Sequence, residues 1–284
     1  MIEVKNLSHQ YPGKNNFAVK NVNFEIKKGE IFGFLGPSGA GKSTVQNLLI
    51  GLLKNQTGII RVDGKDISDL KRDFFERIGV SFELPNLYEK LTGYENLKFF
   101  AGLFKKKCEN PKIILERVGL GEATNKRASD YSKGMKQRLI FSRSIINDPD
   151  ILFLDEPLSG LDPSTSKRIK SIIIEKKNAG KTIFLTTHNM FVAEELCDKV
   201  AFINDGKIVA MDTPKNLKLK YGSYSVKLEY KKNNKSESEI IFLENSEDKE
   251  KLKNIIDNYE IITMHTREAT LEEIFIKLTG RGLE

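Results

Sequence analysis

The sequence predicts an α/β fold with a largely parallel core sheet over its first two-thirds, followed by a small α+β accessory domain. Two observations support this prediction. Short apolar runs, which suit buried parallel strands, alternate with longer segments of helical character. The pattern is then interrupted by a proline and polar residues in DTPKNLKLKYG, near residues 211–221. We therefore expect one domain over residues 1–214 and a second over residues 215–284.

The elements of the first domain follow from its apolar pattern, taken in chain order. A half-buried strand is expected where Val19, Val22, Phe24 and Ile26 lie among polar residues. Apolar runs predict further strands at residues 31–36, 59–62, 78–82, 151–155 and 182–187. Helical character predicts helices at residues 42–52, 94–103, 111–118, 133–146 and 164–178. Strands separated by helices in this order are typical of an α/β domain.

The accessory domain has weaker but readable signals. Val226, Leu228 and Tyr230 alternate with polar residues and predict a strand at 225–230. A second strand is expected at 239–243, and helices at 249–256 and 271–278. Between the two strands, KKNNKSESE at 231–239 is polar and charged, and it predicts a mobile loop.

Composition limits the classes of function. The chain has 46 Lys and Arg against 39 Asp and Glu, a net charge of +7, which is within the ordinary range for a solvated surface. Its longest basic cluster, Lys105–Lys107, is too short to predict a nucleic-acid-binding arm. No apolar run approaches the roughly 18 residues of a membrane span, and the start lacks the pattern of a signal peptide. Two cysteines, Cys108 and Cys197, predict neither a disulfide scaffold nor a metal site, so an intracellular location is the default expectation.

A phosphate-binding loop is the most specific motif. GPSGAGKS satisfies the pattern G-x-x-x-x-G-K-[ST], with an apolar strand before it and a helix after it. Glycines let the backbone wrap a phosphate, and the helix presents its positive end to the anion. Lys42 can reach the β- and γ-phosphates, and the Ser43 hydroxyl can bind Mg²⁺. The expected nucleotide-binding residues are Gly36, Pro37, Ser38, Gly39, Ala40, Gly41, Lys42, Ser43 and Thr44.

A pair of carboxylates ends the apolar run at 151–155. In open α/β sheets, ligands bind at the carboxyl ends of the strands. Asp155 is therefore placed to hold Mg²⁺ through water, and Glu156 to polarise an attacking water. Taken alone, this pair could equally be a solvated strand end before a turn at Pro157. Beside the phosphate loop, the functional interpretation is favoured.

The order of these motifs resembles that of an ATP-binding cassette (ABC) ATPase, specifically the separate nucleotide-binding subunit of an ABC transporter. The resemblance covers residues 1 to about 212. Tyr11 lies where this family has an aromatic residue that stacks on adenine. YSKGMKQR at 131–138 is similar to the family signature, usually written LSGGQ, and SGLD at 159–162 matches the D-loop. His188 matches the switch histidine.

The resemblance implies a P-loop NTPase fold, with a mixed β-sheet core and an α-helical subdomain at about 84–148. It implies that ATP and Mg²⁺ are the cofactors and that Glu156 and His188 are the catalytic residues, His188 contacting both the γ-phosphate and Glu156. Ser132 and Gly134 of the signature would bind the γ-phosphate of ATP held by a second subunit, and Asp162 would lie at the dimer seam. The second subunit would be another copy of this chain or a different cassette.

The sequence departs from the family pattern in two places. Lys133 and Met135 replace the usual Gly and Gln of the signature, although the Ser132 hydroxyl and the Gly134 backbone remain. Glu83 occupies the position of the Q-loop glutamine. A carboxylate can still bind Mg²⁺ but cannot donate a hydrogen bond. The metal ligands implied are therefore Ser43, Glu83 and Asp155, and subunits paired with type-2 (ABC-2) permeases tolerate both departures.

A separate permease is the partner that the resemblance implies. The segment 83–92 with the helix after it resembles the part of the family that receives the coupling helix of the permease, and the candidates for an apolar groove are Leu87, Tyr88, Leu97, Phe99 and Phe100. Packing inside the helical subdomain is the alternative, above all for Leu97 and Phe100. The tail at 270–280 is similar to the tails of drug-export subunits. The chain is thus expected at the cytoplasmic face of the membrane, driving transport, most simply export, without binding nucleic acid.

Two alternatives stay open at this point. One is a soluble ABC ATPase that acts on nucleic acid or the ribosome, which only the basic excess supports. The other is a regulatory module that binds ATP but hydrolyses it poorly, which Glu83 and the altered signature suggest.

Overall fold

A computed structural model describes residues 2–54, 56–69, 71–232, 235–243 and 246–282. The chain divides into two compact units, one ending at Met211 and the other beginning at Asp212. Within the described residues, no helix is both long enough and apolar enough to span a bilayer.

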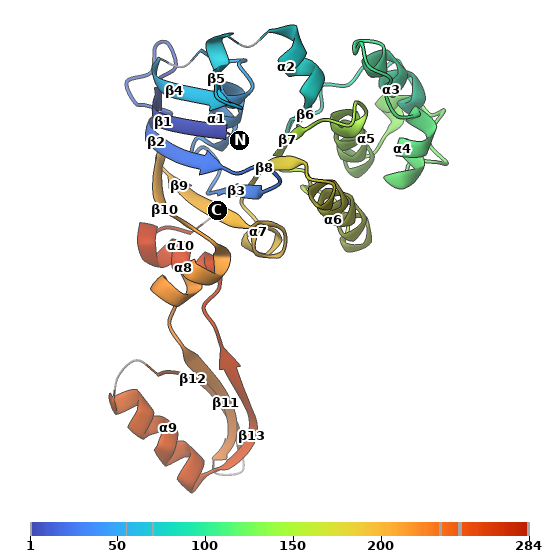
Figure 1. The fold of residues 1–284 in the computed structure, drawn as a ribbon. Helices are drawn as coiled ribbons and strands as arrows, with labels where there is room; N and C mark the ends of the chain where they lie inside the picture. The colour runs from blue at the N-terminus through green and yellow to red at the C-terminus, as the bar shows by residue number, and fades with distance from the viewer. Residues whose placement is uncertain (1, 55, 70, 233–234, 244–245, 283–284) are drawn as a thin grey trace. The chain divides into compact units, whose positions relative to one another are not determined.

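A six-stranded sheet forms the centre of the first unit, in the order β10-β9-β3-β8-β7-β6 (Figure 1). Its strands are β3 (Ile31–Leu35), β6 (Ile78–Ser81), β7 (Ile151–Asp155), β8 (Thr182–Thr187), β9 (Lys199–Asn204) and β10 (Lys207–Asp212). The five strands from β6 to β9 pair in parallel. Every residue of β3, β7 and β8 is buried, which explains why these strands appear in the sequence as continuous apolar runs.

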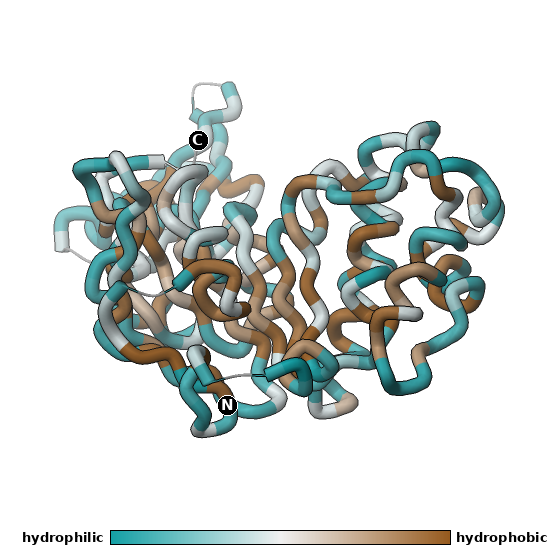
Figure 2. The backbone as a smooth tube through the Cα atoms, turned by 90° about the horizontal axis from the view of Figure 1, so that it is seen from above, coloured by the Kyte–Doolittle hydropathy of each residue, from teal (hydrophilic) through white to brown (hydrophobic). Residues whose placement is uncertain are grey.

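A second, antiparallel sheet packs against the first in the order β2-β1-β4-β5. Its strands are β1 (Ile2–His9), β2 (Val19–Ile26), β4 (Thr57–Val62) and β5 (Lys65–Asp66). Phe24 of β2 meets Phe32, Phe34 and Phe184 of the central sheet, with ring centroids 5.2 to 6.2 Å apart. In Figure 2 the hydrophobic stretches lie mostly in the interior of the tube, while many outer segments are hydrophilic. The core of this unit therefore lies between the two sheets and the helix α1.

Seven α-helices accompany these sheets among the described residues of the first unit: α1 (Lys42–Leu49), α2 (Arg72–Arg77), α3 (Gly93–Ala101), α4 (Pro111–Arg117), α5 (Lys133–Ile145), α6 (Pro163–Asn178) and α7 (Met190–Leu196). Helices α3, α4 and α5 pack on one another, and α5 also packs on strand β6 (Figure 1). Leu97, Ile114 and Leu139 are fully buried at these contacts. Capping side chains explain where the helices begin: Thr92 and Glu95 form a capping box at α3, and Ser132 caps α5.

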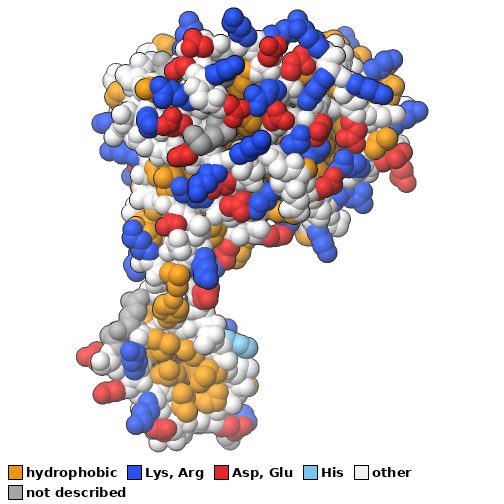
Figure 3. All heavy atoms as spheres, in the orientation of Figure 1, with side chains coloured by type: hydrophobic (Ala, Val, Ile, Leu, Met, Phe, Trp, Pro, Cys, Tyr) orange, Lys and Arg blue, Asp and Glu red, His pale blue; other side chains and the backbone are white. Residues whose placement is uncertain are grey.

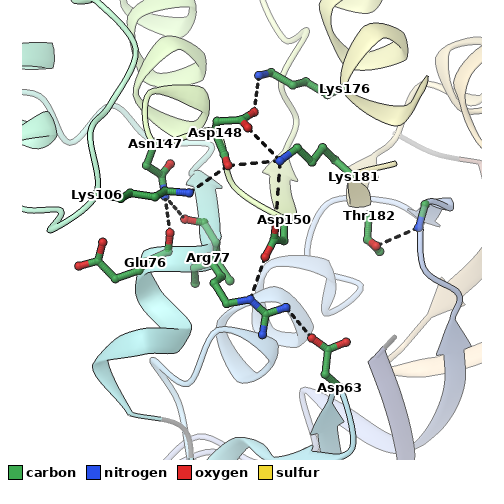
Figure 4. A network of polar contacts seen from close by, with 12 residues as sticks. Asp63, Glu76, Arg77, Lys106, Asn147, Asp148, Asp150, Lys176, Lys181 and Thr182 are labelled. Atoms are coloured by element: carbon green, nitrogen blue, oxygen red, sulfur yellow. Dashed lines mark hydrogen bonds and ion pairs between the residues drawn. The ribbon is translucent and has the colours of Figure 1, made fainter. Parts of the chain in front are cut away.

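A polar network ties the sheet together where its parallel strands begin (Figure 4). Arg77, just before β6, donates to Asp150, just before β7, at 2.8 Å and to Asp63 at 2.7 Å. Lys181 pairs with Asp148 at 3.0 Å, just before β8 begins. These groups are partly exposed, so each pair is worth only about 0.2–1 kcal/mol. The network links the amino ends of the strands. The phosphate loop and Glu156 lie at the opposite, carboxyl ends, after β3 and β7.

The second unit contains a three-stranded antiparallel sheet in the order β12-β11-β13. Its elements are β11 (Ser225–Lys232), β12 (Lys235–Phe242), β13 (Glu260–Arg267) and the helices α8 (Pro214–Tyr221), α9 (Ser246–Asn258) and α10 (Leu271–Thr279). Ile255 of α9 packs on Val226, Leu228 and Tyr230 of β11. Exposed apolar side chains also gather over this unit (Figure 3). Ile256, Ile262 and Met264 each have nearly half of their surface exposed.

The predicted α/β fold is confirmed, and the structure corrects the prediction for the tail. Residues 231–239, expected to be a mobile loop, mostly belong to a hairpin: β11 continues to Lys232 and β12 begins at Lys235, while 233–234 lie outside the described residues. The side chains there are polar, but ladder hydrogen bonds use only the backbone. The proline taken as an interruption is the first residue of α8, where its missing N–H costs nothing, and Thr213 caps this helix.

Candidate functional site

The phosphate loop connects β3 to α1, and glycine is required at two of its positions. A Cβ atom on Gly36 would collide with the carbonyl oxygen of Ile203. Gly41 has a φ of 109°, and a Cβ atom there would lie 2.5 Å from the carbonyl oxygen of Ala18. Because glycine has no side chain, the loop backbone can pass this close to Ile203 and Ala18 and turn tightly into the N-terminus of α1.

Lys42 lies inside this loop with only 8% of its surface exposed. Its ammonium group donates to the carbonyl oxygens of Gly36 at 2.7 Å and Pro37 at 3.0 Å. Burial lowers the pKa of Lys42, while the negative charges of Glu156 and Asp155 partly oppose that shift. Neither hydrogen bond involves a carboxylate, so a phosphate oxygen can replace the carbonyls as a stronger, charged acceptor.

A cavity of about 260 Å³ opens beside the loop. It is lined by Tyr11, Ala18, Ser38, Gly39, Gly41, Lys42, Ser43, Thr44, Glu83, Glu156 and His188. The structure thus brings most of the expected nucleotide-binding residues to one place, together with the two expected catalytic residues. Gly36, Pro37 and Ala40 shape the loop without lining the cavity, and Asp155 is almost fully buried at the end of β7.

Tyr11 lies at the mouth of this cavity, with 38% of its surface exposed. Its hydroxyl is 3.2 Å from the Thr44 hydroxyl. Its ring meets the ring of His9 edge to face, with centroids 5.0 Å apart. An exposed aromatic ring beside a phosphate loop can stack on a nucleobase.

Glu156 follows β7 and is held in one orientation by residues at the end of β8. One carboxylate oxygen accepts the backbone N–H of His188 at 2.8 Å and lies 2.7 Å from Nδ1 of the same residue. The other accepts the Thr187 hydroxyl at 3.1 Å. Glu156 itself has a φ of 46°, a conformation that few residues other than glycine adopt. A carboxylate fixed in this way beside a phosphate loop can take a proton from water.

A divalent cation fits this arrangement only together with phosphate. Among the described residues, no group of three or more His, Cys, Asp or Glu side chains is placed to hold a metal ion. The Ser43 hydroxyl and the Glu83 carboxylate instead line the cavity beside the phosphate loop. Mg²⁺ is commonly bound by one or two protein oxygens plus the phosphates of a substrate, which is the donor set available here.

The signature residues do not line this cavity. Ser132 is an exposed N-cap whose hydroxyl accepts from the backbone N–H of Met135 at 3.2 Å, which leaves its own proton free to donate. The side chain of Lys133 lies across Gly160, where a Cβ atom would be 3.3 Å from its Cε. The signature and the D-loop are therefore neighbours in one chain, and none of Ser132, Gly134 and Asp162 lines the cavity of the chain's own phosphate loop.

Asp162 is the N-cap of α6. Its carboxylate accepts the Thr165 backbone N–H at 3.0 Å and the Ser164 hydroxyl at 2.7 Å. These hydrogen bonds, led by that from Thr165, hold the pKa of Asp162 far below its ordinary value. Asp162 thus satisfies donors in the first turn of α6.

Sequence reasoning missed three residues that position Asp155 and Glu156. Thr186 donates to Asp155, and Thr187 donates to Glu156. Gln137 of α5, which is 5% exposed, donates from Nε2 to the backbone carbonyl of Glu156 at 3.2 Å. A signal was present in the sequence: two threonines at the end of an apolar strand, directly before His188.

A second, larger hollow lies between β6, α3 and α5. This groove has a volume of about 710 Å³ and is lined by Arg72, Phe75, Glu76, Ile78, Gly79, Val80, Phe82, Asn86, Leu87, Tyr88, Phe100, Leu103, Phe104, Arg143 and Asn147. Leu87 and Tyr88 line it as predicted, and Phe100 lines it too, although packing inside the helical subdomain was the favoured expectation for that residue. Leu97 instead belongs to the buried core of the helices, and Phe99 packs edge-on against Tyr88 with 46% of its surface exposed.

Comparisons with known proteins identify relatives for this fold and site. The family model described as ABC transporter matches residues 19–159. The chain is 48% identical over its full length to a fluoroquinolones export ATP-binding protein of Mycobacterium tuberculosis, covering 94% of that protein. It is 38% identical to a lantibiotic transport ATP-binding protein of Streptococcus pyogenes over 74% of this chain and 89% of that protein.

A solved structure supports the same assignment. The dimeric, post-hydrolysis state of an ATP-binding cassette bound to ADP and Pi superposes with a TM-score of 0.69 at 28% identity. The match covers 75% of this chain and 98% of that one.

Proposed function

This chain belongs to the ABC transporter family of ATP-binding proteins, and on that premise we propose that it drives export through a separate membrane permease. It is an ATPase subunit. The observation that carries the proposal is the position of Glu156: its carboxylate is fixed by Thr187 and His188 in the cavity that the phosphate loop lines.

The geometry suggests a role for each residue in ATP hydrolysis. The phosphates would be held by the Lys42 ammonium and the backbone N–H groups at the start of α1. Glu156 would accept a proton from the attacking water, and His188, in contact with Glu156, would orient that carboxylate and contact the γ-phosphate. Tyr11 would stack on the adenine. Mg²⁺, held by Ser43, Asp155 and Glu83 together with the phosphates, would neutralise part of the phosphate charge.

A second cassette is part of the proposal, because the signature cannot serve the site of its own chain. Ser132, Gly134 and Asp162 do not line the 260 Å³ cavity. Ser132 and Asp162 are exposed, so they are available to an ATP held by a partner. We infer that two cassettes close on two ATP molecules, the partner being a second copy of this chain or a different cassette.

The permease, of the ABC-2 type in this proposal, would dock in the 710 Å³ groove, and the chain would then lie at the cytoplasmic face of the membrane. Exposed apolar side chains support docking there, since Phe75, Leu103 and Tyr88 each have about half of their surface exposed. The cargo class is suggested by relatives named for fluoroquinolones export and lantibiotic transport. None of these findings supports the nucleic-acid alternative, which rests on the basic excess alone.

Co-purification tests the proposal. A tagged chain expressed in its native host is isolated from detergent-solubilised membranes, and its partners are identified by mass spectrometry. We expect a multi-span membrane protein in a fixed ratio to the chain, with MgATP hydrolysis that requires Glu156. A chain recovered entirely without a membrane partner, while its ATPase activity is intact, would contradict the role in transport.

A further inference from the structure

Arg143 is a buried cation in the wall of the 710 Å³ groove. It lies on α5 with 8% of its surface exposed. Its guanidinium donates to the backbone carbonyl of Asn86 at 2.8 Å and to the side-chain oxygen of the same residue. Its Cζ lies 4.5 Å from the centroid of the Phe100 ring, a cation–π contact.

The charge of Arg143 has no counter-ion among the residues that the structure describes. A guanidinium has five N–H donors, and both hydrogen bonds found here go to neutral oxygens of one residue. Burial lowers the pKa of Arg143 to about 10, which reflects its poor solvation. A buried charge without a counter-ion is unfavourable, so its presence in a largely apolar wall requires an explanation.

The other charged groups of the groove do not supply this partner. Glu76 lines the groove, but its carboxylate oxygens accept the Lys105 backbone N–H at 3.1 and 3.0 Å. Arg72, also in the lining, adds a second positive charge. The groove is therefore apolar with a net positive charge, and its complement is an apolar surface that carries a carboxylate.

We propose that the permease segment that docks in this groove presents an Asp or Glu side chain to Arg143, surrounded by apolar residues. The apolar residues would pack against Phe82, Leu87 and Phe104. The carboxylate would accept the guanidinium N–H groups that Asn86 leaves unused, in a bidentate pair shielded from water. This inference rests on the proposed function, because it names the chemistry of the same docking partner.

Arg143 also has a structural role that the test must separate from this one. By holding Asn86, it fastens the segment between Glu83 and Tyr88 to α5. Arg143→Met keeps an unbranched apolar stem in place of the arginine stem and removes the charge, whereas Arg143→Lys keeps the charge. Asn86→Ala removes the side-chain oxygen that accepts from Arg143, so it loosens the segment while the charge stays in place. Arg72→Met is a matched control that removes the other positive charge of the groove.

The experiment uses the permease identified by co-purification, reconstituted in nanodiscs, with each Asp and Glu of its cytoplasmic loops changed in turn to Asn or Gln. We expect Arg143→Met to weaken the complex about tenfold or more, and Arg143→Lys to restore part of the affinity. One permease carboxylate variant should weaken the complex similarly, and should have little further effect in the presence of Arg143→Met. Arg72→Met should change the affinity by less than about threefold.

Two results would overturn the inference and leave the proposed function standing. In one, every permease carboxylate has its full effect in the Arg143→Met background, so that none is coupled to Arg143. In the other, Asn86→Ala reproduces the whole loss of affinity, which would make Arg143 a structural residue only. If the unmodified chain binds no permease, the proposed function itself is wrong.

Discussion

Replacement of Glu156 by Gln is the sharpest test of the catalytic assignment. The change exchanges one carboxylate oxygen for an NH₂ group of the same size. The amide oxygen can still accept the His188 backbone N–H, 2.8 Å from the present carboxylate, and the NH₂ group can donate to the Thr187 hydroxyl. Because these contacts can be kept, we expect the free energy of unfolding to change by no more than about 1 kcal/mol.

The catalytic effect should be much larger, because an amide cannot accept the proton of the attacking water. Loss of a general base costs about 10²- to 10⁴-fold in rate, which corresponds to roughly 3–5 kcal/mol in the activation free energy. ATP binding should persist or tighten, since a negative charge near the phosphates has been removed. We therefore also expect Glu156→Gln to accumulate as a nucleotide-bound dimer.

Phosphate release at saturating MgATP measures the rate, and light scattering measures the dimer. Glu83→Gln is the matched control, because it makes the same chemical change in the lining of the same cavity and introduces the usual residue of the family. It should keep or raise the rate. Hydrolysis by Glu156→Gln within about threefold of the unmodified chain would refute the assignment of Glu156 as the base.

Three further predictions follow from the same geometry. Lys42→Ala should weaken ATP binding roughly 10- to 100-fold in calorimetry, since hydrogen bonds to a charged group are worth about 1.5–3 kcal/mol; unchanged affinity would remove Lys42 from the site. Gly41→Ala should destabilise the fold by at least about 3 kcal/mol in chemical denaturation, through backbone strain and the collision with Ala18, whereas Gly39→Ala, with open space around its Cβ position, should cost only about 1–2 kcal/mol. The pKa of Asp162 is lower in the folded state than in the unfolded chain, so its ionised carboxylate stabilises the fold fully above the unfolded pKa of about 3.9. This stabilisation is lost as the pH falls toward the folded pKa. Asp162→Asn should therefore flatten the acid limb of the pH–stability curve, and an unchanged acid limb would contradict this.

Much of the site could be predicted because its motifs are local. The phosphate loop occupies eight consecutive residues between a strand and a helix, and Asp155 and Glu156 end a run of five buried residues. Ser132 and Asp162 each lie directly before a helix, and this position follows from the preference of Ser and Asp side chains for the N-cap. Features of this kind depend on neighbours within a few positions, so composition and periodicity reveal them.

The elements that sequence reasoning missed share a different physical origin. Strand β1 was not predicted, although Val4 and Leu7 are buried, because β1 pairs with both β2 and β4 and its identity depends on those distant partners. Part of the hairpin of β11 and β12 was predicted as a loop, because its side chains are polar and give no strand signal. The two strands are nevertheless joined by backbone pairing, which does not depend on the side-chain type. Partners distant in the sequence overrode local propensity in both cases.

The sequence by itself determined that a phosphate is bound here and which carboxylates stand near it, because each motif is a short run whose backbone geometry its own residues dictate. Only the tertiary structure decided that Glu156 meets Thr187, 31 positions further on, and that Arg143 reaches Asn86, 57 positions before it. The first contact arises because parallel strands end at one edge of a sheet, and the second because α5 packs on β6. The groove and its buried guanidinium exist only through that packing, and no local pattern encodes them.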